Sequence, residues 1–247
     1  MKLSVYFTPL GVTHHAVAGI PVVVLDVLRA TSSIVAALAN GARAVVPETT
    51  ADEALRVAKN LERDDVLLAG ERGGHRIDGF ALGNSPLEMT AETVSGKTLV
   101  MATTNGTGAL VAAEPGRPVL VGAITNFSAV VARAGEELQR TGKLTILCSG
   151  RERMFALEDA YVAGRITKAL LPDGKRANVE LNDAAIAALE LVRRYGDRWK
   201  RAVVASAAAR ELKQIGYRHD VEAVTEVDLY DIVPVYAERI IKVPTAP

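Results

Sequence analysis

Short apolar runs rich in valine, leucine and isoleucine alternate along this chain with alanine-rich segments of helical periodicity. Strands that are apolar throughout are typical of sheets buried on both faces, and helices between them supply the cover. The alternation therefore predicts an α/β protein. We expect strands over roughly 3–7, 20–26, 43–47, 65–69, 97–102, 118–122, 143–148 and part of 226–236. We expect helices over roughly 30–39, 51–61, 106–113, 126–140, 156–170, 182–195 and 203–215.

The chain has no low-complexity segment and no long Pro/Gly linker, so we expect a single domain over residues 1–247. The stretch PDGKRANVELND, 172–183, is the candidate for a subdomain boundary. Two strand-turn-helix units, LDVLRATSSIVAA from Leu25 and MATTNGTGALVAA from Met101, share a threonine and a Val-Ala-Ala run. Two internally similar halves would explain this echo, and so would shared composition.

The charge and cysteine content restrict the partners of the protein. Lys+Arg and Asp+Glu both total 29, so no global field attracts nucleic acid or an anionic membrane. The single cysteine excludes an intramolecular disulfide and a zinc site built from several thiolates. No signal-like segment or apolar window of about 18 residues is present. We therefore expect a cytoplasmic protein without nucleic-acid or membrane partners; self-association into a homo-oligomer stays open.

Asp26 and Arg29 stand where the apolar run IPVVVL ends and the helical sequence ATSSIVAAL begins. A carboxylate at the tip of a buried strand requires a cation, a metal ion or backbone donors. Asp26 is explained either as a helix cap or ion-pair partner of Arg29, or as a magnesium ligand or nucleophile. The helix start, with Thr31 and Ser32, suits a phosphate oxygen, and Arg29 would add a bidentate contact.

Acidic residues, arginines and Gly/Thr/Asn loops recur at the ends of at least five predicted strands. Taken singly, each is equally a helix cap, a turn or a solvated surface. Together they suit a divalent-metal phosphate site, because oxygen-rich ligands favour Mg²⁺ and phosphoryl transfer depends on electrostatic stabilisation. These further candidates are Glu71, Arg72, Asn84, Thr104, Asn105, Gly106, Thr107, Asn126, Ser149, Arg151, Glu158 and Asp159.

Six ordered motifs, DVLRATSSI, GERGG, GFALGNSP, TTNGT, ITN and SGRERMFALEDA, resemble the 2-phosphosulfolactate phosphatase family, known as ComB, over roughly residues 3–236. The resemblance implies a ComB-like three-layer α/β/α fold with a mixed, largely parallel sheet. It also implies Mg²⁺-dependent hydrolysis of 2-phosphosulfolactate to sulfolactate and phosphate, a step of coenzyme M biosynthesis. The substrate would be a small anionic phosphate ester.

Beside this resemblance, the candidate residues divide into roles. Asp26, Glu71 and one of Glu158 and Asp159 would hold Mg²⁺; adjacent residues on a helix diverge by about 100°, so we expect only one of that pair to face the site. The backbone of 30–33 and 104–107 would hold the phosphate. Arginines and asparagines would bind and orient the ligand, with Asp26, Arg29, Glu71 and Arg72 as the catalytic set; these binding residues are Arg29, Arg72, Arg151, Asn84, Asn105 and Asn126. Where the family is often acidic, after Phe80, this chain has Ala81.

Two other functions compete with this hypothesis. A haloacid-dehalogenase-like phosphatase with an aspartyl nucleophile normally needs a DxD motif, and the second position of that motif is Leu28 here. A non-catalytic anion-binding module would also use the Gly/Thr/Asn loops. Clustered carboxylates argue against the module, because they oppose anion binding unless a metal ion intervenes.

Overall fold

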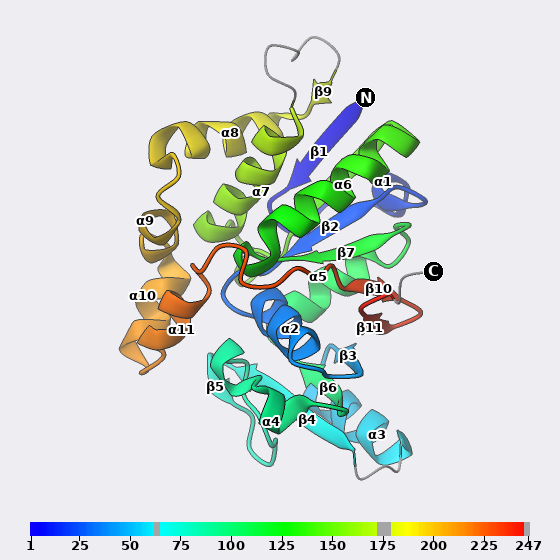
Figure 1. The fold of residues 1–247 in the computed structure, drawn as a ribbon, viewed down its shortest axis with the longest axis vertical. Coiled ribbons are helices and arrows are strands. Elements are labelled where there is room, and N and C mark those ends of the chain that lie inside the picture. Colours follow the sequence, from blue (N-terminus) through cyan, green and yellow to red (C-terminus); the bar gives the residue numbers. More distant parts are fainter. Residues whose placement is uncertain (62–64, 172–178, 245–247) are drawn as a thin grey trace.

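A computed structural model describes residues 1–61, 65–171 and 179–244. These residues form an α/β fold with one eleven-stranded sheet (Figure 1). The strands are β1 (Lys2–Tyr6), β2 (Val22–Leu25), β3 (Ala44–Glu48), β4 (Val66–Arg72), β5 (His75–Arg76), β6 (Thr98–Ala102), β7 (Val119–Gly122), β8 (Lys143–Cys148), β9 (Glu180–Leu181), β10 (Val235–Ala237) and β11 (Ile240–Lys242).

The sheet consists of two parallel blocks joined by an antiparallel hairpin. Its strand order is β5-β4-β6-β3-β11-β10-β7-β2-β8-β1-β9. Strands β4, β6 and β3 pair in parallel, as do β7, β2, β8, β1 and β9, while the β10–β11 hairpin pairs antiparallel with β7 and β3. The predicted α/β class with a mixed, largely parallel sheet is confirmed.

The helices connect the strands and cover the sheet. They are α1 (His14–Val17), α2 (Ala30–Ala39), α3 (Ala51–Leu61), α4 (Ala91–Val94), α5 (Gly106–Ala113), α6 (Phe127–Thr141), α7 (Leu157–Leu170), α8 (Asp183–Tyr195), α9 (Trp199–Val204), α10 (Ala207–Gln214) and α11 (Arg218–Ala223). Single 3₁₀ turns lie at Pro86–Glu88 and Ile124–Asn126. None of the helices in the described ranges has the length and apolar character needed to cross a membrane.

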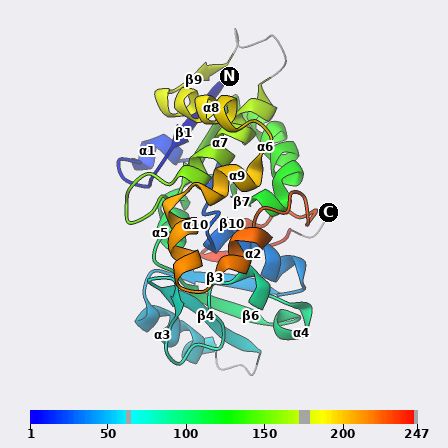
Figure 2. The same cartoon turned by 90° about the vertical axis from the view of Figure 1, so that its left-hand side faces the viewer.

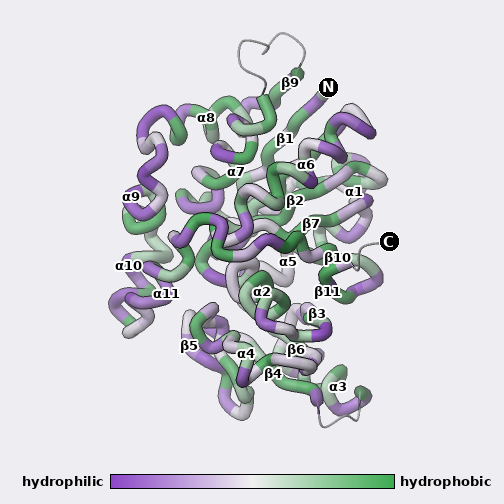
Figure 3. Tube along the Cα trace, viewed as in Figure 1, coloured by the Kyte–Doolittle hydropathy of each residue, from purple (hydrophilic) through white to green (hydrophobic). Residues whose placement is uncertain are grey.

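Both faces of the sheet are buried under helices. Alternate β2 residues show this: Val23 and Leu25 pack in the cluster that includes α6 and α7, whereas Val22 and Val24 pack in the cluster that includes α2 and α5. Helix α2 is buried from Ala30 to Leu38, and Figure 3 shows its hydrophobic colouring against the more hydrophilic α10 and α11. Its small side chains permit this close packing.

Two predicted boundaries were wrong in ways that affect the site. Strand β4 continues to Arg72, beyond the predicted 65–69. The predicted helix 203–215 is two helices, because Ser206 caps α10 by accepting a hydrogen bond from the Ala209 N–H. The prediction of a strand over part of 226–236 is confirmed by the short strand β10, which begins at Val235. Figure 2 shows α9, α10 and α11 lying together on one side of the molecule.

The domain organisation remains a prediction. Of the proposed boundary segment 172–183, residues 172–178 lie outside the described residues, and Glu180–Leu181 form β9 beside β1. The two echoed units lie at the β2–α2 and β6–α5 connections. Equivalent positions arise from duplication and from two unrelated strand-turn-helix units alike, so the internal duplication stays a prediction.

Candidate active site

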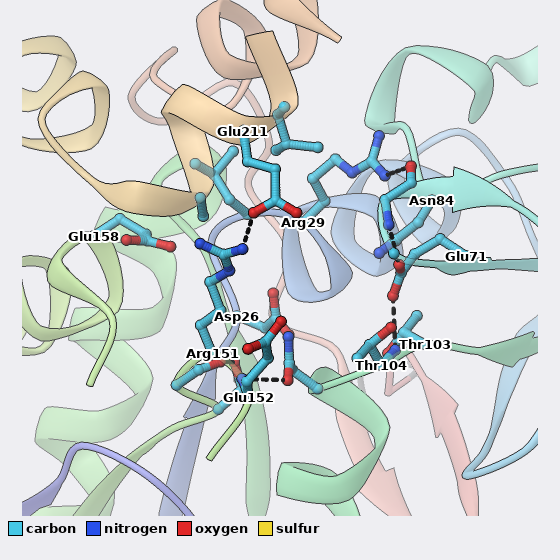
Figure 4. A pocket seen from close by; sticks show the side chains of 18 of the residues that line it. Asp26, Arg29, Glu71, Asn84, Thr103, Thr104, Arg151, Glu152, Glu158 and Glu211 are labelled. Carbon is cyan, nitrogen blue, oxygen red and sulfur yellow. Dashed lines mark hydrogen bonds and ion pairs between the residues drawn. The ribbon is translucent and has the colours of Figure 1, made fainter. Parts of the chain in front are cut away.

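One pocket lies where strands β2, β6 and β8 end, with the end of β4 and helix α10 completing its wall (Figure 4). The arrangement agrees with the rule that ligands in α/β sheets sit beyond the carboxyl ends of strands. The predicted site residues that line it are Asp26, Arg29, Glu71, Asn84, Thr104, Asn105, Ser149, Arg151, Glu158 and Asp159.

Asp26 lies at the end of β2 and is almost fully buried. Its Oδ1 accepts a hydrogen bond from the Ala30 N–H, at 3.1 Å, so α2 begins directly against it. Gly106, the first residue of α5, allows a second helix start to approach: a Cβ there would lie 2.8 Å from Asp26 Oδ2 and 2.4 Å from Ala30 Cβ. Burial raises the pKa of Asp26 to about 6, and the nearby Glu71 charge adds to the rise.

Glu158 and Asp159 occupy the first turn of α7 and are both buried at the pocket. The expectation that only one of them faces the site was therefore wrong: the pocket wraps around the helix start. Asp159 accepts hydrogen bonds from the Val27 N–H at 2.9 Å and from Ser149 Oγ and the Gly150 N–H at 3.2 Å. It thereby joins the ends of β2 and β8.

Burial and mutual repulsion keep these carboxyl groups from ionising readily. Burial, followed by the charge of Asp26, raises the pKa of Glu158 to about 7. Burial, then Glu158, then Asp26, raise the pKa of Asp159 well above its usual value. The three carboxyls thus form a cluster whose negative charge the protein alone does not compensate.

We expect Glu158→Gln to stabilise the metal-free protein at pH 8 but not at pH 5. An acid whose pKa rises on folding binds more protons in the folded state, so stability falls as pH rises from the unfolded pKa, near 4.5, to the folded pKa, about 7. The neutral amide removes this penalty, worth a few kcal/mol. Melting temperatures in EDTA would measure it. The exposed Glu190→Gln on α8 is the control, and an equal shift at both pH values would contradict the prediction.

Glu71 and Arg72 occupy opposite sides of β4. Glu71 is buried, and its two oxygens accept hydrogen bonds from the Gly74 N–H at 2.8 Å and the Thr104 N–H at 2.7 Å. Arg72 is exposed and does not line the pocket, since successive side chains of a strand alternate. The sequence prediction placed Glu71 and Arg72 in a loop after the strand, where alternation would not apply. We exclude Arg72 from the proposed catalytic set.

The Arg29 guanidinium is held by groups from two other parts of the chain, the β4–β5 turn and the start of α11. It donates to Asp220 Oδ2 at 2.7 Å and to the Gly74 carbonyl at 2.6 Å, and it lies 4.4 Å from the centre of the Tyr217 ring. Asp220 Oδ1 also accepts from Ser85 Oγ at 2.6 Å. Sequence reasoning missed Asp220 and Tyr217, because their contact with Arg29 depends on the packing of α11 and the residue before it.

The hydroxyls predicted to bind phosphate serve the backbone instead. Thr31 Oγ1 donates to the Asp26 carbonyl, Ser32 Oγ to the Val27 carbonyl and Thr107 Oγ1 to the Thr103 carbonyl. Such local bonds are typical of Ser and Thr near helix starts. These three residues and Gly106 do not line the pocket, and we exclude them from direct substrate contact.

Asn126 is also placed away from the pocket. Its side chain is fully buried, accepts from the Ala123 N–H and donates to the carbonyls of Val121 and Ile232. It therefore connects the end of β7 to the chain leading into β10, and we exclude it too from substrate binding. Ala81 is exposed and does not line the pocket.

Helix α10 contributes a wall that sequence reasoning missed, through Ala208, Glu211, Leu212 and Ile215. Their spacing places them on one helix face, which is a signal in the sequence, but it does not say what that face contacts. Glu211 forms an ion pair with Arg151, whose guanidinium lies between Glu211 and Glu158 in Figure 4.

The donor chemistry of the pocket fits a hard divalent cation. Among the described residues, no three Asp, Glu, His or Cys side chains converge closely enough to enclose an ion. The Asp26, Glu158 and Asp159 carboxyls nevertheless cluster, and Asn84 Oδ1 at the same pocket is buried without a hydrogen-bond partner in the described structure. Carboxylate and amide oxygens are the ligands that Mg²⁺ and Ca²⁺ prefer. Glu71 and Asp159 fit this role less well, because N–H and O–H donors occupy both oxygens of each carboxylate.

Comparisons with known proteins show the family of the chain. A family model described as 2-phosphosulpholactate phosphatase matches residues 6–239. A protein of Caldanaerobacter subterraneus subsp. tengcongensis, named probable 2-phosphosulfolactate phosphatase, is 36% identical over 242 residues, 98% of each chain. Proteins with the same name from Thermotoga maritima and Symbiobacterium thermophilum are 40% and 38% identical, covering 86% and 90% of this chain and 87% and 93% of their own. With a match over nearly its whole length, the chain belongs to the 2-phosphosulfolactate phosphatase family.

Proposed function

We propose that this protein is a Mg²⁺-dependent phosphatase that hydrolyses 2-phosphosulfolactate, or a similar small anionic phosphomonoester, to the alcohol and phosphate. The observation that carries the proposal is the buried cluster of Asp26, Glu158 and Asp159 in a pocket that also contains two arginines. Carboxylates repel an anionic substrate, so a pocket that combines them with arginines binds such a substrate only when a bound cation compensates the carboxylates. The names of the relatives supply the substrate class.

The proposed metal ligands are Asp26, Asn84 Oδ1 and Glu158, because both oxygens of Asp159 already accept hydrogen bonds. A bound Mg²⁺ neutralises charge on the phosphoryl group and polarises its oxygens. Arg29 is fixed by Asp220 and presents a constant positive charge at the pocket wall. Arg151 offers a planar donor pair for an anionic group of the substrate. Thr104, Asn105 and Ser149 supply the polar wall between them.

The position of Asp26 at the pocket also allows a variant of this chemistry, in which its carboxylate attacks phosphorus. Attack would form an aspartyl phosphate and release the alcohol, and water would then hydrolyse the acyl phosphate. Leu28 stands where the general acid of haloacid-dehalogenase-like enzymes is expected, so we prefer Asp26 as a metal ligand. Beryllium fluoride distinguishes the two mechanisms, because an adduct on Asp26 identifies it as the nucleophile.

The direct test is phosphate release from 2-phosphosulfolactate and from a panel of small phosphomonoesters. We expect turnover with Mg²⁺ and a decrease of about tenfold or more in EDTA, reversed by added Mg²⁺, because a metal supplies several kcal/mol of charge stabilisation. Phosphate binding without release from any ester would instead support the anion-binding module. Full activity in EDTA would contradict the metal requirement while leaving the phosphatase function intact.

A further inference from the structure

Helix α10 places one charged side chain, Glu211, on a pocket wall that is otherwise made of Ala208, Leu212 and Ile215. Leu212 is buried and Ile215 is half-buried, and both belong to the main hydrophobic cluster. A carboxylate on such a face, in a pocket that should admit anions, opposes ligand entry. The ion pair with Arg151 compensates the charge of Glu211 at this position.

The two arginines of the pocket are held in opposite ways. The side chains of Arg29 and Asp220 are only 2% and 4% exposed, and Ser85 and Gly74 complete their hydrogen bonds. The side chains of Arg151 and Glu211 are 30% and 43% exposed. A partly exposed ion pair contributes little to stability, because solvent screens it. Arg29 is therefore fixed, whereas Arg151 can exchange its partner at small cost.

Carboxylate, sulfonate and phosphate oxygens all match the guanidinium fork of an arginine. In Figure 4, Arg151 lies on the side of the pocket near Glu211 and Glu158, whereas Asn84, Glu71 and Thr104 lie on the other side. Asp26 lies at the bottom of the pocket between them. A phosphoryl group placed against Asp26 and Asn84 would therefore leave Arg151 for a different anionic group of the same molecule.

We propose that Glu211 is a specificity-determining residue: it binds Arg151 in the free protein and is displaced by a non-reacting carboxylate or sulfonate of the substrate. The inference rests on the proposed function for the identity of the reacting group. The exchange replaces the Glu211 carboxylate on Arg151 by an anionic group of the substrate. A phosphomonoester with a second anionic group therefore gains a contact with Arg151, and a phosphomonoester without one does not. Arg151 thereby selects polyanionic phosphomonoesters over simple ones, and Glu211 sets the strength of this preference because it competes for the same guanidinium.

The test measures binding separately from turnover. Sulfolactate carries the two non-reacting anionic groups and no phosphate, so the part of its affinity that Arg151→Gln removes, measured with Mg²⁺ present, reports on Arg151. Glu211→Gln is expected to tighten sulfolactate binding about threefold to tenfold by calorimetry, because the weak competing ion pair is lost. Glu190→Gln, which breaks an exposed ion pair with Arg193 on α8, is the matched control and should leave the affinity unchanged.

Kinetics and a second substitution complete the test. Glu211→Gln should lower KM for 2-phosphosulfolactate by a similar factor and leave KM for p-nitrophenyl phosphate unchanged. In an Arg151→Gln background, Glu211→Gln should no longer tighten sulfolactate binding. Unchanged sulfolactate affinity, an equal change in KM for both esters, or a full gain without Arg151 would each overturn the inference. Absence of turnover with the binding result intact would instead contradict the proposed function.

Discussion

Asp26→Asn is expected to lower turnover at least about a hundredfold, the scale of losing one electrostatic contact at a reacting phosphoryl group. The amide retains an oxygen that can accept from the Ala30 N–H, and it has nearly the size of the carboxylate that Gly106 accommodates. What it loses is the negative charge and one oxygen donor. Either role of Asp26, metal ligand or nucleophile, requires both. Steady-state kcat at saturating Mg²⁺ measures the effect.

The fold should survive this substitution. Burial raises the pKa of Asp26 to about 6, so the pocket penalises the charged form of this side chain relative to water. A neutral amide therefore removes a cost instead of adding one, and the melting temperature should not fall. Asp52→Asn, an exposed change on α3, is the matched control and should leave kcat unchanged. Activity of Asp26→Asn near the wild-type value would show that Asp26 serves only to cap α2.

The sequence predicted the part of the pocket that depends on local rules. Polar residues that directly follow apolar strands, such as Asp26, Ser149 and Thr104, meet at one pocket because strand ends in an α/β sheet converge there. Glu158 and Asp159 follow because α7 begins shortly after β8. These placements require only the strand positions and the turn that comes next.

The missed and misplaced residues depend on longer-range packing or on exact boundaries. Arg72 lies outside the pocket because β4 continues to this residue, and the side chains of a strand alternate between its two sides. The Thr31 hydroxyl accepts a hydrogen bond from the Asp26 N–H and donates one to the Asp26 carbonyl, so it serves the backbone and not a ligand. Glu211 reaches the pocket and Asp220 reaches Arg29 only because α10 and α11 pack there, almost two hundred residues after Asp26 in the chain. No local periodicity encodes that contact.

Asp220→Ala is expected to be the most destabilising of the substitutions considered. It removes the carboxylate that pairs with the buried Arg29 guanidinium and leaves the contacts with the Gly74 carbonyl and the Tyr217 ring. Ser85 Oγ loses its acceptor as well. Removing one member of a buried ion pair typically costs about 3–5 kcal/mol, because the remaining charge is uncompensated. For a chain of this size we expect the melting temperature to fall by about 10 °C.

Urea unfolding and thermal melting measure this loss, and Glu180→Ala provides the control. Glu180 pairs with Lys2 at 2.9 Å, but those side chains are largely exposed, so breaking that pair should change stability little. Equal effects of the two substitutions would show that the Gly74 carbonyl and Tyr217 suffice to hold Arg29. A larger effect of Asp220→Ala, accompanied by reduced turnover in the folded fraction, would show that α11 maintains the charge of the pocket by fixing Arg29, and that the C-terminal helices are part of the active site.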